Sequence, residues 1–407
     1  MTNQGIYIHV PFCKSRCIYC DFFSTTFGGS MQDDFVSAVS CEASYRQHYL
    51  AHTETDSVYI GGGTPSALSE RNIGRLLHTV QNLFDISPDA EITVEVNPND
   101  VIPSLIETMK RNGVNRISMG IQSFNDNMLR FLHRRHSSQE AITAIDTIIS
   151  GGIENISIDL IYGLPEQTVK DWDRDLNIAF SLPISHLSAY SLMFEDGTRL
   201  SRMRDDGIIK EADEEISLQM FGNLMRKAKE ESFDHYEISN FSLSGKQARH
   251  NTGYWTGMHY LGLGPGAHSY NGISRQQNIC DLKAYVKAYG DTAIDPSGIM
   301  ETETLSMAQK KEEALLTSLR TAQGLDLHDY ALRFGQKALN GLLERAKPFI
   351  NDGRLLPLNR HNSSFADAGP TGKSSPKAHS DTTANNYLAL STKGIFVSDY
   401  IITSLFE

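Results

Sequence analysis

Three of the five cysteines of the chain, Cys13, Cys17 and Cys20, lie within eight consecutive positions in a C-x3-C-x2-C pattern. Thiolates are soft ligands that bind iron–sulfur clusters, copper(I) or zinc, and closely spaced cysteines on one loop can surround a single centre. A four-iron cluster held by only three thiolates keeps one iron without a protein ligand. The spacing therefore predicts a cluster with an open corner at which a small molecule binds.

Zinc and disulfides are the alternatives to a cluster. Zinc sites usually contain two C-x2-C pairs, and this chain has no second pair, although His9 could serve as a fourth ligand. A disulfide framework is typical of secreted chains with an even number of cysteines, whereas this chain has five and no expected signal peptide. We expect the remaining two, Cys41 and Cys280, to pack as small apolar side chains.

The cysteine pattern, with Tyr19 before the last cysteine, resembles the signature of radical S-adenosylmethionine (SAM) proteins. This resemblance implies a [4Fe-4S] cluster whose open iron chelates the amino and carboxylate groups of SAM. Further motifs resemble those of the coproporphyrinogen-dehydrogenase-like branch of these proteins: YIHVPFC, GGGTP, EVNP, SMGIQSF, SIDLIYGLP and YEISNF. The residues that the resemblance places beside the cluster or SAM are Tyr7, Tyr19, Gly62, Gly63, Thr64, Glu95, Gln122, Arg134 and Asp159.

Phe22 stands where the oxygen-independent coproporphyrinogen oxidases of this branch carry a fourth cysteine. The chain instead resembles the HemW heme-chaperone family, whose loop reads C-D-F as Cys20-Asp21-Phe22 does. That resemblance implies a protein that binds heme and delivers it to apo-hemoproteins, with an electron donor for the cluster. The alternative is an enzyme with the same cofactors that decarboxylates coproporphyrinogen III to protoporphyrinogen IX.

The HNxxYW motif that begins at His250 is the part of the chain that the resemblance assigns to heme. Imidazole ligates heme iron, and a Tyr–Trp pair can cover an apolar macrocycle. A buried histidine beside packed aromatic side chains gives the same pattern and stays open as the alternative. The heme residues implied are His250, Asn251, Tyr254 and Trp255.

Short apolar runs alternate with amphipathic helical patterns six times between Gly5 and Leu192. This alternation predicts a parallel sheet that curls into a partial (β/α)6 barrel. Sites in such barrels collect at the carboxyl ends of the strands. Glu95 and Asp159 interrupt apolar strands, where a carboxylate is costly without a partner, so we expect them to face one mouth that holds a zwitterionic nucleoside.

We expect two domains: a radical SAM core over residues 1–240, with the cluster loop at 11–23, and a HemN-like C-terminal domain over residues 241–407. The second reads as mostly helical and, by resemblance, ends in a winged-helix-like tail. Residues 359–386 contain few apolar side chains, which predicts a mobile loop.

The formal net charge of −12 gives no basic surface for a phosphate backbone, so we expect no nucleic-acid partner. No stretch approaches the roughly 20 apolar residues of a membrane span. We therefore expect a cytoplasmic protein that contacts membrane surfaces only transiently, through recipient hemoproteins. Both a monomer and a homodimer fit the sequence.

Overall fold

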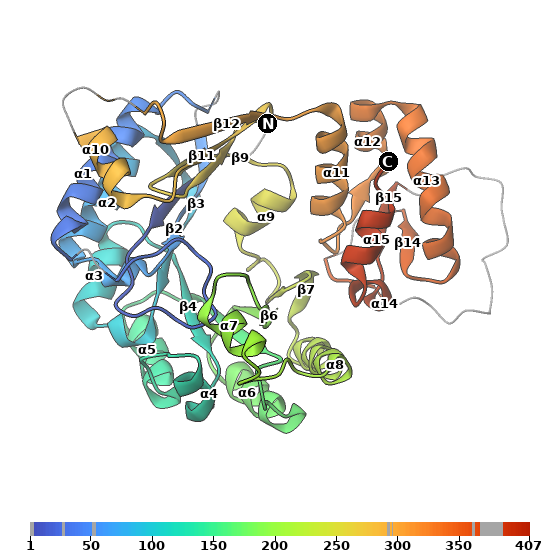
Figure 1. Cartoon of the computed structure of the whole chain (residues 1–407), viewed down its shortest axis with the longest axis horizontal. Helices are drawn as coiled ribbons and strands as arrows, with labels where there is room; N and C mark the ends of the chain where they lie inside the picture. The colour runs from blue at the N-terminus through green and yellow to red at the C-terminus, as the bar shows by residue number, and fades with distance from the viewer. Residues whose placement is uncertain are drawn as a thin grey trace. The chain divides into compact units, whose positions relative to one another are not determined.

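The computed structural model describes residues 4–26, 29–50, 54–290, 294, 296–359, 363–366 and 386–407 (Figure 1). Most of the expected mobile loop, residues 360–362 and 367–385, lies outside these described residues. The chain forms two compact units and passes between them more than once. Unit 1 is Met1–Lys227, Ala248–Gly253 and Met258–Thr304; unit 2 is Ala228–Gln247, Tyr254–Gly257 and Leu305–Glu407.

Six parallel strands form the centre of unit 1 and pair in the order in which they occur in the chain. They are β1 (Gln4–Val10), β2 (Glu54–Gly62), β3 (Asp85–Val96), β4 (Arg116–Gln122), β5 (Asn155–Tyr162) and β6 (His186–Ser191). Branched apolar side chains such as Ile6, Ile8 and Val94 are completely buried, as expected for strands covered on both faces. The prediction of a partial (β/α)6 barrel is confirmed.

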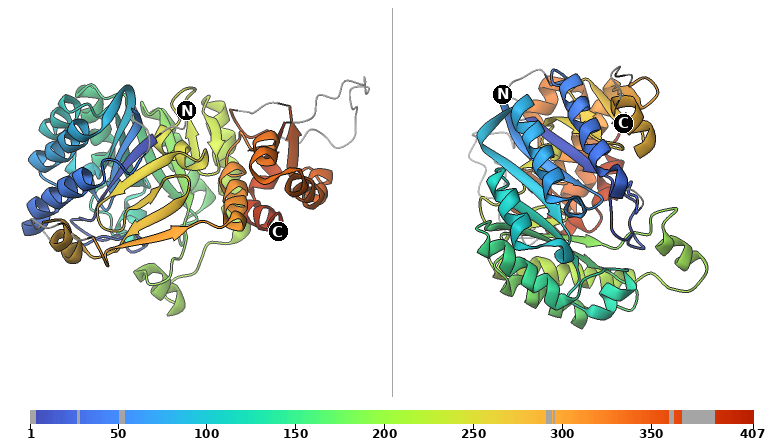
Figure 2. Two further views of the ribbon diagram at one scale, coloured as in Figure 1. Left: turned by 90° about the horizontal axis from the view of Figure 1, so that it is seen from above. Right: turned by 90° about the vertical axis from the view of Figure 1, so that its left-hand side faces the viewer.

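Helices follow each of these strands, and most of them pack along the outer side of the sheet in unit 1, whereas α7 projects away from it (Figure 2). Side chains of Ser69, Ser137 and Thr168 cap the starts of three of them by accepting backbone hydrogen bonds. The helices are α1 (Gln32–Tyr45), α2 (Glu70–Leu83), α3 (Pro103–Arg111), α4 (Asp126–Phe131), α5 (Ser138–Ser150), α6 (Val169–Ser181), α7 (Arg199–Asp205) and α8 (Glu214–Glu230), whose last residues belong to unit 2.

The sequence reading did not anticipate an extension of the sheet beyond β1. Strand β9 (His259–Leu263) pairs with β1 in parallel, and β10 (His268–Tyr270), β11 (Ser274–Asn278) and β12 (Met300–Thr304) continue the sheet in antiparallel fashion. Helix α9 (Arg249–Trp255) precedes this extension, and α10 (Leu282–Gly290) packs against α1. Strands that are remote in sequence thus border β1, the strand that leads into the cysteine loop.

Unit 2 is mostly helical, as expected for the C-terminal part. It contains the antiparallel pair β7 (Asp234–Glu237) and β8 (Asn240–Ser242), and a three-stranded sheet in the order β13-β15-β14. Its remaining elements are α11 (Met307–Ser318), β13 (Leu325–Asp326), α12 (Leu327–Phe334), α13 (Gln336–Asn351), β14 (Leu355–Leu358), β15 (Tyr387–Leu390), α14 (Thr392–Ile395) and α15 (Ser398–Ser404). The winged-helix-like tail and the boundary at residue 240 stay predictions.

Within the described residues, no helix has both the length and the apolar character that crossing a bilayer requires.

Candidate functional site

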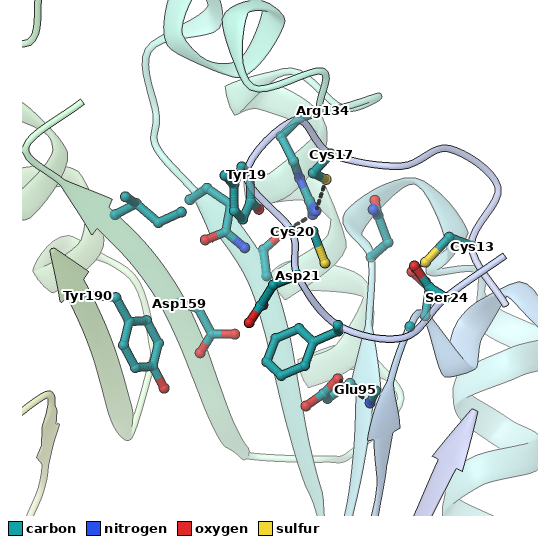
Figure 3. Close-up of a pocket in the computed structure, with 18 of the residues that line it drawn as sticks. Cys13, Cys17, Tyr19, Cys20, Asp21, Ser24, Glu95, Arg134, Asp159 and Tyr190 are labelled. Atoms are coloured by element: carbon teal, nitrogen blue, oxygen red, sulfur yellow. Dashed lines mark hydrogen bonds between the residues drawn. The ribbon is translucent and has the colours of Figure 1, made fainter. Parts of the chain in front are cut away.

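A cavity of about 450 Å³ opens at the carboxyl ends of the unit 1 strands. The loop that follows β1 forms one wall, and the ends of β2 to β6 form the others (Figure 3). The structure brings most of the predicted site residues together here. Those that line the cavity are Cys13, Cys17, Tyr19, Cys20, Gly62, Gly63, Thr64, Glu95, Gln122, Arg134, Asp159 and Asn251.

The cysteine loop is closed at its base by backbone hydrogen bonds. The Cys13 N–H donates to the Thr25 carbonyl at 3.0 Å, and the Thr25 N–H donates to the Pro11 carbonyl at 2.7 Å. Short loops clamped in this way hold their side chains in a restricted space, and the thiols of all three labelled cysteines face the cavity (Figure 3). All three are free thiols, and burial raises the pKa of Cys13 and raises that of Cys20 to about 11.

The glycine turn after β2 packs directly against the base of this loop. A Cβ on Gly62 (φ 105°) would lie 2.6 Å from the His9 ring, and one on Gly63 would lie 2.8 Å from the carbonyl oxygen of Val10. Only glycine fits at these two positions, because a side chain would force the turn away from the loop. The Gly63 N–H donates to the Val10 carbonyl at 2.8 Å, and the Thr64 hydroxyl donates to Cys13 Sγ at 3.4 Å.

Two carboxylates, Glu95 on β3 and Asp159 on β5, face the cavity opposite the thiols (Figure 3). Glu95 accepts hydrogen bonds from the Tyr59 hydroxyl at 2.7 Å and the Gly62 N–H at 3.2 Å. Burial raises the pKa of Glu95 to about 7 and that of Asp159 to about 6. Each ionised carboxylate loses water on burial, and the donors to Glu95 and the Ser188 hydroxyl beside Asp159 replace that water only in part. Both groups can therefore accept a cation or further hydrogen-bond donors.

Strained backbone and an incompletely bonded guanidinium mark the end of β4. Gln122 has a φ of 76° beside a register shift in the β4–β5 pairing, a conformation that costs energy for a residue other than glycine. Arg134 donates to Cys17 Sγ at 3.5 Å and to the Gly120 carbonyl. Its Nε is buried and has no hydrogen-bond partner among the described residues. An unpaired guanidinium donor beside a cavity suits a carboxylate ligand.

Of the residues assigned to heme, only Asn251 lines the cavity. The His250 side chain is 1% exposed, its Nδ1 lies 2.9 Å from the Ser57 hydroxyl, and its ring stacks on Tyr59 at 5.4 Å. Burial lowers the pKa of His250 to about 3, so the imidazole is neutral at physiological pH. Tyr7 packs in the same interior against His9 and His250, and Tyr254 and Trp255 belong to unit 2.

Several residues that line the cavity were missed by the sequence reading. They share one feature: they alternate with apolar positions on the strands, so that polar side chains two residues apart face the barrel interior. This period of two was the signal that could have found them. Arg116 is the clearest case, since it is 1% exposed at the start of a buried strand. The missed residues include Tyr59, Arg116, Ser118, Ser188 and Tyr190.

Three thiols on the loop after the first strand of a partial (β/α)6 barrel are features of radical SAM proteins, and the Radical SAM superfamily matches residues 7–179. The chain is 32% identical to the Heme chaperone HemW of Bacillus subtilis (strain 168) over 364 residues, and these residues make up 89% of this chain and 94% of that protein. It is 34% identical to the Heme chaperone HemW of Mycobacterium tuberculosis (strain ATCC 25618 / H37Rv), over 86% of this chain and 88% of that one. The chain therefore belongs to the HemW family of the radical SAM superfamily.

The fold also resembles that of coproporphyrinogen III oxidase (HemN) from Escherichia coli. The TM-score is 0.80 at 20% sequence identity, over 100% of this chain and 90% of that one. At this identity the likeness establishes a HemN-like fold. Phe22, at the position of the fourth cysteine in the oxidase pattern, is 62% exposed and lines the cavity.

Proposed function

We propose that this protein is a heme chaperone that holds a [4Fe-4S] cluster and SAM in the unit 1 cavity and delivers heme to apo-hemoproteins. The observation that carries the proposal is that three free thiols and the donors and acceptors for a zwitterionic nucleoside line one cavity. Membership of the HemW family supports the part of the proposal that concerns heme and its delivery to hemoproteins.

The cluster ligands in this proposal are Cys13, Cys17 and Cys20. Their soft sulfur atoms suit iron, and no other protein thiol lines the cavity among the described residues, which leaves one iron open. No three histidine, cysteine or carboxylate side chains of the described residues converge tightly enough to hold a single metal ion. A cubane does not need such convergence, because each thiolate binds a different iron.

The remaining cavity residues match the chemical groups of SAM one by one. The Arg134 guanidinium, with its unpaired Nε, suits the carboxylate; Glu95 suits the ammonium group; Gln122 and Asp159 suit the ribose hydroxyls. A unit-charge pair at about 4 Å contributes about 4 kcal/mol at an effective dielectric constant near 20, before the cost of desolvation. Gly62 and Gly63 let the backbone approach the ligand closely. A reduced cluster can supply an electron to bound SAM, and an electron-donor protein is therefore part of the proposal.

Heme is proposed to bind at the HNxxYW segment, through His250, Asn251, Tyr254 and Trp255. Because His250 is buried and bonded to Ser57, ligation of heme iron by this imidazole requires α9 to move away from β2. Heme binding through His250 should consequently increase hydrogen exchange in α9. Mass spectrometry of the exchanged α9 peptide with and without heme measures this.

The test is anaerobic reconstitution with iron and sulfide, followed by titration with SAM and heme. We expect about four iron atoms per chain and a broad visible absorbance that Cys17→Ser removes. Cys41→Ser is the matched control, because Cys41 lies on α1 outside the cavity and should leave the spectrum unchanged. Heme-loaded protein should then convert an apo-hemoprotein to its holo spectrum.

Two results would replace this proposal. Formation of protoporphyrinogen IX from coproporphyrinogen III at enzymatic rates would make the protein the oxidase instead. One zinc per chain without acid-labile sulfide would make the cysteine loop a structural metal site.

A further inference from the structure

A carboxylate that does not line the cavity connects the segments that form its walls. Asp100 ends the short helical turn η3 (Pro98–Asp100) after β3, and its side chain is 1% exposed. Its Oδ1 accepts a hydrogen bond from Lys14 Nζ at 2.7 Å. Arg135 Nη2 lies 3.1 Å from both carboxylate oxygens, and the Ser66 hydroxyl donates to Oδ2 at 3.2 Å.

The three partners of Asp100 come from three different walls. Lys14 lies between the first two cysteines of the loop, Ser66 belongs to the turn that follows Thr64, and Arg135 follows Arg134. Ser66 in turn accepts the Asn97 N–H at 3.0 Å, which ties in the segment after Glu95. One carboxylate thus links the cysteine loop, the glycine turn, the Arg134 segment and its own turn.

The energetics favour a positioning role over a general contribution to stability. The Lys14 side chain is 51% exposed and Arg135 is 28% exposed, so each ion pair taken alone is screened by water. Bonds to a buried charge are nevertheless stronger than neutral ones and directional, and here they all converge on one group. A loop ordered before it meets its ligand loses less conformational entropy on binding.

We propose that Asp100 is a positioning residue that holds the Cys13–Cys17 segment and the Arg134–Arg135 segment in their binding geometry before any cluster is present. This inference rests on the proposed function, since it assigns Asp100 a role toward the three thiols. Asp100 itself does not line the cavity and acts through Lys14, Ser66 and Arg135.

The experiment compares wild type, Asp100→Asn and Glu42→Gln as full-length, cluster-free, reduced protein. Glu42 is a second buried carboxylate of unit 1 that pairs with an arginine, at 2.9 Å from Arg46, but lies outside the cavity lining. The readouts are hydrogen exchange over residues 13–20 and the alkylation rates of Cys13, Cys17 and Cys20. Cys41 and Cys280 serve as internal standards.

In Asp100→Asn we expect about a tenfold rise in exchange and alkylation at the loop, the size of effect expected from losing charge-assisted bonds. The rates at Cys41 and Cys280 should not change. Asp100→Glu, which keeps the charge, should recover part of the protection. Glu42→Gln should leave the loop as protected as in wild type at temperatures where each variant is folded.

Unchanged loop exchange in Asp100→Asn would overturn the proposal, and so would an equal rise in Glu42→Gln, which would indicate general destabilisation. If Asp100→Asn does not fold, Lys14→Gln replaces it, because the half-exposed Lys14 can be changed safely; the rise should then be smaller and no rise overturns the proposal.

A wild-type protein that takes up no cluster would refute the proposed function, whereas the exchange measurements on cluster-free protein still decide the role of Asp100. Reconstitution of each variant completes the test. Asp100→Asn should assemble its cluster more slowly than Glu42→Gln does.

Discussion

Two of the groups of buried polar side chains in unit 1, one around Glu42 and one around Glu95 and Asp159, differ in how fully their carboxylates are bonded. Glu42 on α1 is 0% exposed and accepts from Arg46 Nη1 at 2.9 Å, from Asn278 Nδ2 at 2.8 Å, from the Gly264 N–H at 2.8 Å and from the Tyr285 hydroxyl. Around Glu95 and Asp159 the donors are fewer, and both carboxylates open onto the cavity.

This difference separates a group that stabilises the fold from one that is available for a ligand. The donors of Glu42 come from the residue after α1, from α10 and from the β9–β11 part of the sheet, so the group links the antiparallel extension to the barrel. Fully bonded polar groups rigidify a protein interior, whereas incompletely bonded ones cost stability. The raised pKa values of Glu95 and Asp159 reflect that cost, which a cationic ligand with hydroxyl donors would offset.

Breaking the fully bonded group around Glu42 should have the largest effect on stability. Glu42→Gln leaves Arg46, which is 6% exposed, without its counter-charge, and should lower the free energy of unfolding by about 3 kcal/mol. Urea denaturation of the ligand-free protein measures this. The SAM affinity of the folded variant should match that of wild type. If the free energy of unfolding falls by less than about 1 kcal/mol, the two groups do not differ as described.

His250→Ala tests the connection beneath the cavity, because His250 stacks on Tyr59, whose hydroxyl donates to Glu95. The lost packing should lower the free energy of unfolding by about 2 kcal/mol. Heme affinity should fall while iron and sulfide content stays the same. Unaltered heme titration would move the heme site away from this residue.

Removing the charge of Glu95, in the group whose carboxylates are incompletely bonded, should change the free energy of unfolding in the opposite direction. Glu95→Gln should raise the free energy of unfolding of ligand-free protein by about 1 kcal/mol at pH 8, because a neutral amide tolerates burial better than a carboxylate exposed to some cavity water. The same change should weaken SAM binding by about tenfold or more, through loss of the ammonium partner. Destabilisation at pH 8 would contradict the assignment.

The pH dependence of stability gives the smallest and most specific test. The pKa of Glu95 is about 7 in the folded protein against 4.5 for the ordinary value, so the folded state binds more protons between these two pH values. The contribution of Glu95 to stability is therefore present below pH 4.5 and is lost as the pH rises toward 7. His250 acts in the opposite sense, since its lowered pKa makes stability fall as the pH drops from 6.5 toward 3.

The difference between wild type and Glu95→Gln isolates the first of these effects. Urea denaturation at pH 5 and at pH 7.5 should show wild type losing stability relative to the variant by about 1 kcal/mol. If the free energy of unfolding changes equally in the two proteins between pH 5 and pH 7.5, Glu95 titrates normally.

Local spacing in the sequence determined the cysteine loop and the strand–helix alternation, and hence the partial barrel. Both depend on short-range patterns: three thiols within one loop, and apolar runs whose period is that of a buried strand. The polar residues at strand ends followed from the same alternation, because parallel strands of a barrel end at one mouth. Gln122 was among these strand-end residues, and Arg134 was placed on or near the helix that follows it; the family motifs then marked the same two residues.

Only the tertiary structure decided which buried groups are bonded and which are open. Lys14 and Asp100 are 86 residues apart, and Glu42 and Gly264 are 222 residues apart. The burial of His250 likewise depends on its contacts with β2 and β3. The chain passes through unit 2 before it returns to unit 1 at α9 and makes these contacts. Such contacts arise from packing between distant segments, and no pattern within either segment contains them.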